Sequence, residues 1–213
     1  MARPLLKVCG VRDAAFAARA ARLGVDYIGV IFAAKSPRRV SEDEARAVAA
    51  AARGAAAAGA KPPKVVGVFV ETPPQEIARL AESVPLDVAQ LHAPYDDAAV
   101  AALKAVGLEV WRLSADADDG RHGEDAVLLD GRSGGMSGGT GTLADWSRVA
   151  GLKSSGRRVV LAGGISPANA AAAAATGADI LDANSSLETS PGAKSPALLL
   201  DLLRALGRLP LGG

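Results

Sequence analysis

The sequence predicts an α/β protein in which eight strands and their helices close into one (βα)8 barrel. Three observations support this fold class. Short apolar, β-branched runs recur eight times, and stretches rich in Ala, Leu, Arg and Glu separate most of them. Such near-continuous apolar runs are typical of parallel strands covered by helices. The length suits one large domain over residues 1–213, and TIM barrels of about 200 residues occur.

The strands are expected where the apolar runs lie. In chain order they are residues 5–11, 27–32, 64–70, 88–91, 108–113, 126–130, 159–163 and 179–183. The helices are expected at residues 13–23, 41–53, 74–83, 96–106, 144–153, 167–176 and 195–206. Residues 114–125 (SADADDGRHGED) are too polar and too rich in Gly and Asp for an amphipathic helix. The helix after the fifth strand is therefore expected to be short or replaced by a loop.

Several expected helices carry start and stop signals. Ser41 precedes three acidic residues, as an N-cap residue often does, and Ser166 precedes a proline at the first expected helical position. Glycines follow three of the helical stretches, at Gly24, Gly107 and Gly177. An open doubly wound sheet also alternates strands with helices. However, the first strand leads into Cys-Gly-Val-Arg and lacks the G-x-G-x-x-G turn of dinucleotide-binding sheets.

The composition excludes several classes of protein. A net charge of +1 provides no field for gathering nucleic acid or anionic membrane. The single cysteine allows no intramolecular disulfide, and the N-terminus lacks the apolar core of a signal peptide. No apolar run is long enough to span a membrane, and no cluster of His and carboxylates has metal-ligand spacing. We expect a cytoplasmic protein that binds a small molecule and no metal.

Chemistry in a barrel is expected at the C-terminal ends of the strands. Cys9 ends the first apolar run, where it is either a small buried hydrophobe or a thiolate base, since a free thiol has a pKa of about 8.5. Asp130 ends the sixth run in AVLLDG, where it is either a capping residue or a general acid. A thiol and a carboxylate at one rim could work on opposite sides of a proton transfer.

Two glycine-rich segments could cradle an anion, although such segments are often only flexible linkers. They are residues 134–141 (GGMSGGTG) and residues 161–165 (LAGGI), the second at the usual phosphate position of barrels together with Ser185 and Ser186. Residues 35–41 (KSPRRVS) follow the second strand. They are either a solvated basic loop or the source of an arginine that pairs with a carboxylate or phosphate.

These residues recur in a known order and spacing. The matching segments are KVCGVRD, GVDYIGVIFAAKSPRRVS, VGVFV, AQLHA, LLDG, GGTGTLADW, LAGGISPANA and LDANSSLETSPGAKS. With them the chain resembles the phosphoribosylanthranilate isomerase family of tryptophan biosynthesis, a family of (βα)8 barrels. The resemblance runs from one end of the chain to the other.

The resemblance implies an Amadori rearrangement of N-(5′-phosphoribosyl)anthranilate to its 1-deoxyribulose isomer, without a cofactor. Carried over by motif, Asp130 is the general acid that opens the furanose ring, and Cys9 is the general base that removes the C2′ proton. Arg38 binds the anthranilate carboxylate in preference to its neighbour Arg39, Asp182 hydrogen-bonds substrate and His92 plays a supporting part. The residues implied in phosphate binding are Gly141, Gly163, Gly164, Ser185 and Ser186.

The chain departs from the family pattern at Ala93, Ala144, Ser186 and Ser195. Of these, Ser186 stands where the family has glycine, which puts the geometry of the phosphate loop in question because serine tolerates fewer backbone angles.

Two alternatives stay open. One is an aldolase-like barrel, which needs a Schiff-base lysine at a strand end, where Lys7 is the candidate to weigh. The other is a non-enzymatic barrel that binds phosphorylated ligands, although such a relative is expected to have lost the thiol or the carboxylate. Whether the chain is a monomer or a homodimer, and whether it also accepts the aminoimidazole substrate of histidine biosynthesis, is left undecided.

Overall fold

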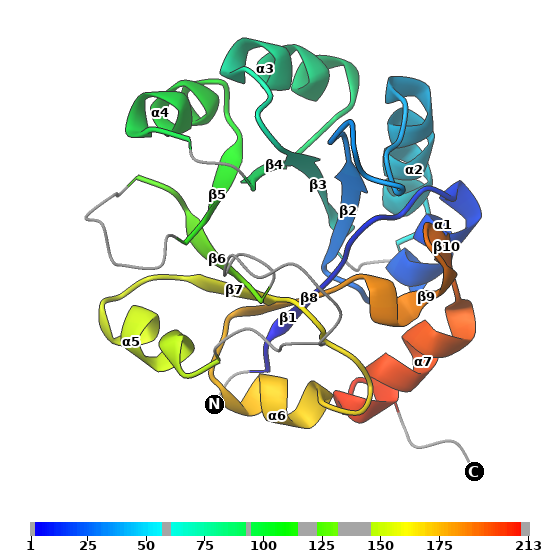
Figure 1. Ribbon diagram of the computed structural model, residues 1–213. Coiled ribbons are helices and arrows are strands. Elements are labelled where there is room, and N and C mark those ends of the chain that lie inside the picture. The colour runs from blue at the N-terminus through cyan, green and yellow to red at the C-terminus, as the bar shows by residue number, and fades with distance from the viewer. Residues whose placement is uncertain (1–2, 57–60, 93–94, 115–122, 132–145, 210–213) are drawn as a thin grey trace.

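Eight parallel strands form a closed barrel in chain order in the computed structural model (Figure 1). The structure describes residues 3–56, 61–92, 95–114, 123–131 and 146–209. The strands are β1 (Leu5–Val8), β2 (Tyr27–Ile31), β3 (Lys64–Phe69), β4 (Val88–Leu91), β5 (Glu109–Leu113), β6 (Ala126–Asp130), β7 (Val159–Ala162) and β8 (Ile180–Ala183). β1 pairs with β8 from Leu5↔Ile180 to Val8↔Ala183, which closes the barrel. The predicted fold class is confirmed.

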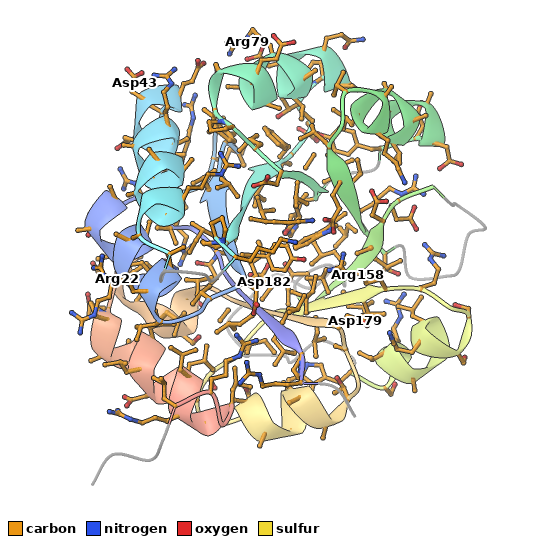
Figure 2. The ribbon with its side chains drawn as sticks, turned by 180° about the vertical axis from the view of Figure 1, so that it is seen from behind. Arg22, Asp43, Arg79, Arg158, Asp179 and Asp182 are labelled. Carbon is orange, nitrogen blue, oxygen red and sulfur yellow. The ribbon has the colours of Figure 1, made fainter. Side chains whose placement is uncertain are left out.

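The helices form a ring outside the strands (Figure 1). They are α1 (Ala14–Arg22), α2 (Glu42–Gly54), α3 (Pro74–Ser83), α4 (Asp97–Ala105), α5 (Arg148–Ser154), α6 (Ala170–Ala175) and α7 (Pro196–Ala205). Figure 2 shows charged side chains such as Arg22, Asp43 and Arg79 on the outer faces of this ring, whereas Asp182 lies in the middle of the barrel. Within the described residues, no helix has both the length and the apolar composition that crossing a bilayer requires.

Alternation along each strand divides the core into two parts, because residues two apart share a face. The helix-facing positions pack with the helices into the larger apolar cluster. The inward positions of the middle layer form a second cluster, in which the Tyr27 and Trp111 rings meet edge to face with centroids 5.0 Å apart. The packed interior confines open space to the strand ends, so the layer that contains Cys9, Ile31 and Val68 forms the floor of any cavity there.

The helix boundaries follow some of the predicted signals. Ser41 and Glu44 form a reciprocal capping box at the start of α2. The three predicted C-terminal glycines have positive φ, at +76° for Gly24, +86° for Gly107 and +82° for Gly177. The expectation for the helix after the fifth strand falls on residues 115–122, which lie outside the described residues.

Other boundaries differ from the prediction. β1 ends at Val8, before Gly10, whose φ of +68° is incompatible with a strand. α6 begins at Ala170, later than residue 167, because the Asn169 amide bonds back to the Ser166 N–H and the Gly164 carbonyl and holds this segment in a turn. α5 begins at Arg148 after a turn at 146–147.

The segment between β8 and α7 contains elements that the sequence did not predict. It forms a short 3-10 helix η1 (Ser185–Leu187) and the antiparallel pair β9 (Glu188–Ser190) and β10 (Ala193–Lys194).

Candidate active site

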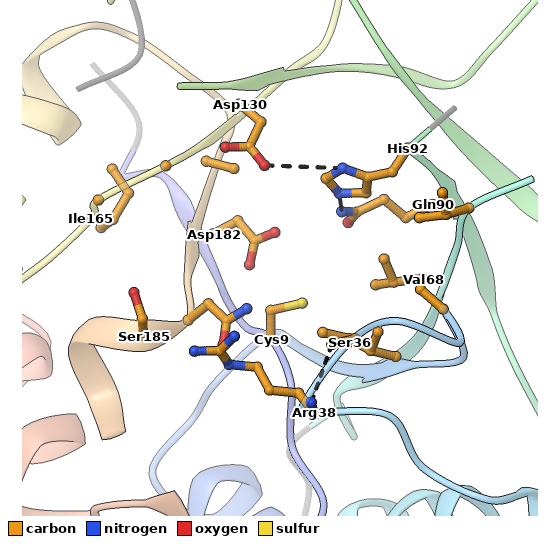
Figure 3. Close-up of a pocket in the computed structure, with 17 residues that line it drawn as sticks. Cys9, Ser36, Arg38, Val68, Gln90, His92, Asp130, Ile165, Asp182 and Ser185 are labelled. Atoms are coloured by element: carbon orange, nitrogen blue, oxygen red, sulfur yellow. Dashed lines mark hydrogen bonds and ion pairs between the residues drawn. The ribbon is translucent and has the colours of Figure 1, made fainter. Parts of the chain in front are cut away.

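A cavity of about 480 Å³ opens at the C-terminal ends of the strands. Figure 3 shows Cys9, Arg38, His92, Asp130, Asp182 and Ser185 around it. Gly163 and Gly164 also line it, so the structure brings most of the predicted site residues to one place. Gly141 lies outside the described residues. Arg39 is exposed and does not line the cavity, in keeping with the choice of its neighbour Arg38.

Cys9 faces the cavity from the end of β1, beside a buried ion pair. The Lys7 ammonium, which has no exposed surface, lies 2.6 Å from Asp182 Oδ2 on the adjoining strand β8. Burial lowers the pKa of Lys7, but Asp182 and Cys9 outweigh it and raise that pKa overall. Burial raises the pKa of the Cys9 thiol, and the Lys7 ammonium acts in the opposite direction. The thiol therefore depends on its buried neighbour for any thiolate character at neutral pH.

Gly29 on β2 makes room for this group. A Cβ at position 29 would lie 3.0 Å from Cys9 Sγ, 3.0 Å from Lys7 Cε and 3.1 Å from Cys9 Cα. The thiol and the ammonium stem thus both pack against the bare backbone of Gly29. Sequence reasoning missed this residue, because a lone glycine within an apolar strand gives no sign of what packs against it.

Asp130 enters the cavity at the end of β6, opposite a hydrogen-bonded pair from β4. Its Oδ2 lies 4.0 Å from His92 Nδ1, and His92 Nε2 lies 2.6 Å from the Gln90 amide nitrogen. Burial lowers the pKa of His92, which favours the neutral ring, and the Asp130 charge acts in the opposite direction. A neutral ring that accepts from the Gln90 amide at Nε2 carries its proton on Nδ1, the nitrogen that faces Asp130. Gln90 was not predicted, although its place two residues before His92 gives it the same inward face.

Two buried acceptors in the cavity lack partners among the described residues. Asp182 Oδ1 and Gln90 Oε1 have no hydrogen bond from any residue that the structure describes. Buried polar atoms are nearly always hydrogen-bonded in proteins. Both atoms therefore suit donors from a bound molecule.

Gly163 and Gly164 turn the chain sharply after β7, with φ of +86° and +77°. A Cβ on Gly163 would lie 2.5 Å from the Gly131 nitrogen and 3.0 Å from Asp130 Oδ1, so any side chain there would collide with the end of β6. Ser185 faces the same rim (Figure 3). Ser186 does not line the cavity, because its hydroxyl donates to the Ile165 carbonyl and fastens η1 to the loop after β7.

Arg38 reaches the cavity from the loop after β2 and is held by Glu188 of β9. Its Nε lies 2.8 Å from Glu188 Oε1, and its Nη2 lies 2.7 Å from Oε2. Burial would raise the pKa of Glu188, but hydrogen bonds from Arg38 and Lys194 lower it to about 2. Sequence reasoning found Arg38 but missed its partner Glu188 and the Lys194 that also binds Glu188. Both lie in the segment ETSPGAK, and a charged residue there gives no sign of the distant residue that it contacts.

The family model described as N-(5'phosphoribosyl)anthranilate (PRA) isomerase matches residues 6–205 of the chain. The chain belongs to this family. A phosphoribosylanthranilate isomerase of Rubrobacter xylanophilus is 38% identical over 202 residues, a span of 91% of this chain and 94% of that protein. The crystal structure of phosphoribosyl anthranilate isomerase from Thermus thermophilus is 32% identical with a TM-score of 0.82, covering 95% of this chain and 98% of the other.

A further structural relative is a phosphoribosylanthranilate isomerase in complex with reduced 1-(o-carboxyphenylamino)-1-deoxyribulose 5-phosphate. It has a TM-score of 0.77 at 23% identity and covers 97% of this chain and all of its own, 100%. The match with phosphoribosylanthranilate isomerases thus extends over nearly the whole length of both sequence and fold. The protein is accordingly an isomerase of tryptophan biosynthesis.

Proposed function

We propose that the cavity carries out the Amadori rearrangement of N-(5′-phosphoribosyl)anthranilate to 1-(2-carboxyphenylamino)-1-deoxyribulose 5-phosphate, with Asp130 as general acid and Cys9 as general base. The observation that supports these roles is that a thiol directly after β1 and a carboxylate at the end of β6 line one cavity. Acid and base on different strands can reach different atoms of one sugar. The ligand in the complexed relative, a carboxyphenylamino sugar phosphate, is of the class that this role requires.

The proposed reaction begins with proton transfer from the Asp130 carboxyl group to the furanose ring oxygen. The C1′–O bond breaks, and the electron pair of the anthranilate nitrogen forms the Schiff base. The Cys9 thiolate then removes the C2′ proton, and the C–H electron pair moves toward the nitrogen to give an enolamine. Tautomerisation gives the ketone. The substrate's own nitrogen accepts the electrons, so no cofactor is expected.

The proposed substrate contacts come from different parts of the cavity lining. Arg38 binds the anthranilate carboxylate, whereas Gly163, Gly164 and Ser185 bind the phosphate through their backbone N–H groups. Asp182 Oδ1, which accepts no hydrogen bond from a described residue, accepts one from a sugar hydroxyl. His92 supports Asp130 through Nδ1, the ring nitrogen that faces Asp130 Oδ2. Phosphate roles for Gly141 and Ser186 stay predictions from the sequence, and Ser186 could contribute only its backbone N–H, because its hydroxyl is engaged.

The aldolase alternative loses support at Lys7. A Schiff-base lysine must present a neutral amine to substrate, but the Lys7 ammonium is paired with Asp182, has a raised pKa and is absent from the cavity lining. A cytoplasmic location and a monomeric or homodimeric state stay predictions.

The roles are tested with Cys9→Ser and Asp130→Asn, assayed by the loss of anthranilate-sugar fluorescence. General acid–base catalysis contributes about 10²- to 10⁴-fold, so each variant should lose activity of that order while circular dichroism shows an unchanged fold. Asp43→Asn is the matched control, because the Asp43 side chain is 89% exposed on the outer face of α2. Near-normal turnover by either active-site variant would overturn the role assigned to that residue.

A further inference from the structure

We infer that Glu188 and Lys194 are positioning residues that fix the Arg38 guanidinium relative to Ser185, one of the residues proposed to bind phosphate. The cavity would then select ligands by the distance between their carboxylate and their phosphate. This inference rests on the function proposed above. It assigns a task to the β9–β10 hairpin, which none of the proposed catalytic steps uses.

Glu188 holds one edge of the Arg38 guanidinium and leaves another open. Nε donates to Oε1 at 2.8 Å and to Oε2 at 3.1 Å, and Nη2 donates to Oε2 at 2.7 Å. No described residue accepts a hydrogen bond from Nη1. As far as the described residues go, the Nη1–Nη2 edge is therefore open to a second carboxylate. A guanidinium binds a carboxylate well through two parallel N–H groups. Arg38 lines the cavity, so the ligand carboxylate can approach that edge from inside it.

Lys194 connects the Arg38–Glu188 pair to Asn184, at the edge of the cavity that is proposed to bind phosphate. Its buried ammonium lies 2.8 Å from Glu188 Oε1, 2.9 Å from the Asn184 carbonyl and 2.8 Å from Asn184 Oδ1. The three contacts use all three donors of the ammonium group. Asn184 directly precedes Ser185, which lines the phosphate edge of the cavity. The hairpin register pairs Lys194 with Glu188, so the backbone itself holds the cation and the anion together.

Gly10 provides an independent sign that this arrangement is tightly built. Its Cβ, if present, would lie 2.9 Å from Arg38 Cδ and 2.9 Å from Asn184 Oδ1. The φ of Gly10, +68°, disfavours any side chain as well. Arg38 and Asn184 thus converge over the residue next to Cys9, where a side chain at position 10 would displace them.

The charge of the cluster also suits an incoming anion. Arg38 and Lys194 supply two cations against the single carboxylate of Glu188. The Glu188 and Lys194 side chains are only 4% and 1% exposed, so water screens this imbalance poorly. A ligand carboxylate on Arg38 would neutralise the cluster.

The test uses two ligands that differ only in the carboxylate, 1-(2-carboxyphenylamino)-1-deoxyribitol 5-phosphate and 1-phenylamino-1-deoxyribitol 5-phosphate. Their dissociation constants are measured by calorimetry on the full chain. For Glu188→Gln we expect the preference for the carboxylate ligand to fall roughly tenfold to a hundredfold, since the arginine is no longer held by a charged partner. Affinity for the phenylamino ligand should change less than about twofold. Lys194→Met removes the contacts to both Glu188 and Asn184, so it should weaken binding of both ligands.

Steady-state kinetics gives a second readout. Glu188→Gln should raise KM for the aminosugar phosphate and leave kcat within about twofold, because Arg38 binds the carboxylate and takes no part in the proposed proton transfers. The matched control is Glu82→Gln on the exposed face of α3, which should leave both constants unchanged. Thermal unfolding of each variant shows whether a loss of binding reflects loss of fold.

The outcomes separate this inference from the function on which it rests. Arg38→Met should abolish the preference for the carboxylate ligand, and retention of that preference would overturn the proposed role of Arg38. If Arg38→Met loses the preference but folded Glu188→Gln keeps it, the role of Arg38 stands and the positioning inference is wrong. Equal loss of both ligands by Glu188→Gln would also contradict the inference, since it predicts an effect at the carboxylate end.

Discussion

Replacing Lys7 with methionine would remove the cation that compensates two buried groups, Asp182 and Cys9. The pair joins β1 to β8 at 2.6 Å, with side chains 0% and 5% exposed. Breaking a buried ion pair by removing one partner costs about 3–5 kcal/mol, because the remaining charge stays buried without compensation. A domain of this kind has roughly 5–15 kcal/mol of stability in total. Lys7→Met should therefore fold but unfold at a much lower urea concentration.

The double variant Lys7→Met/Asp182→Leu should recover most of this loss, because apolar residues of similar volume often replace a buried pair without cost. The difference between the single and double variants is measured by urea unfolding. Lys61→Met at an exposed position is the matched control. A Lys7→Met protein as stable as the wild type would refute the view that Asp182 depends on the Lys7 ammonium.

The same variant also tests the electrostatics of Cys9. The ammonium favours the thiolate, so Lys7→Met should raise the thiol pKa further, and each unit of increase lowers the thiolate fraction tenfold at a fixed pH below that pKa. The rate of alkylation by iodoacetamide across pH 6–10 measures this, and because Cys9 is the sole cysteine of the chain the rate reports on it alone. An alkylation profile that stays in place or moves to lower pH would contradict the proposed interaction.

Three further changes test other parts of the molecule. Gly29→Ala should crowd Cys9 and Lys7, lower the free energy of unfolding in urea by about 1–3 kcal/mol and reduce turnover. Gly54→Ala is the control, because nothing lies within 4 Å of that position, and it should leave the stability unchanged. Equal behaviour of the two variants would refute the crowding argument. Ser41→Ala removes the capping box of α2 and should cost about 0.5–2 kcal/mol, against no change for exposed Ser190→Ala. Glu188 has a folded pKa of about 2 against an ordinary value of 4.5, so the stability from its charge is present above pH 4.5 and is lost as the pH falls toward 2. The stability difference between wild type and Glu188→Gln should therefore shrink over that interval, and a difference independent of pH would contradict the shift.

The rule that chemistry lies at the ends of barrel strands selected Cys9 and Asp130 as candidates from the sequence, and the family resemblance supplied their roles. Each is a polar residue that follows an apolar run, and the closed barrel turns both toward one cavity. Arg38 needed the family resemblance, because nothing in KSPRRVS distinguishes it from Arg39. The structure separates the two, since Arg38 alone of the pair lines the cavity.

The residues that sequence reasoning missed act through contacts between distant segments. Glu188 meets Arg38 across 150 positions of chain, and no local pattern reports such a contact. The start of α6 was misplaced for a related reason. Ser166-Pro167 carries a valid local signal for a helix start, but the Asn169 side chain satisfies the nearby backbone groups in a turn and delays the helix.

The ion pair between Lys7 and Asp182 joins residues that lie 175 positions apart. A chain growing from its N-terminus produces the lysine almost at once, yet its counter-ion appears only when most of the polypeptide has been synthesised. Until then we expect the Lys7 ammonium to stay solvated, because burying an unpaired ammonium is strongly unfavourable. We therefore expect the first strand to take its place in the barrel only after the eighth strand is made. The barrel would then close and the proposed acid and base would come together in the same late step. A chain truncated before β8 should therefore have neither a closed barrel nor the assembled site.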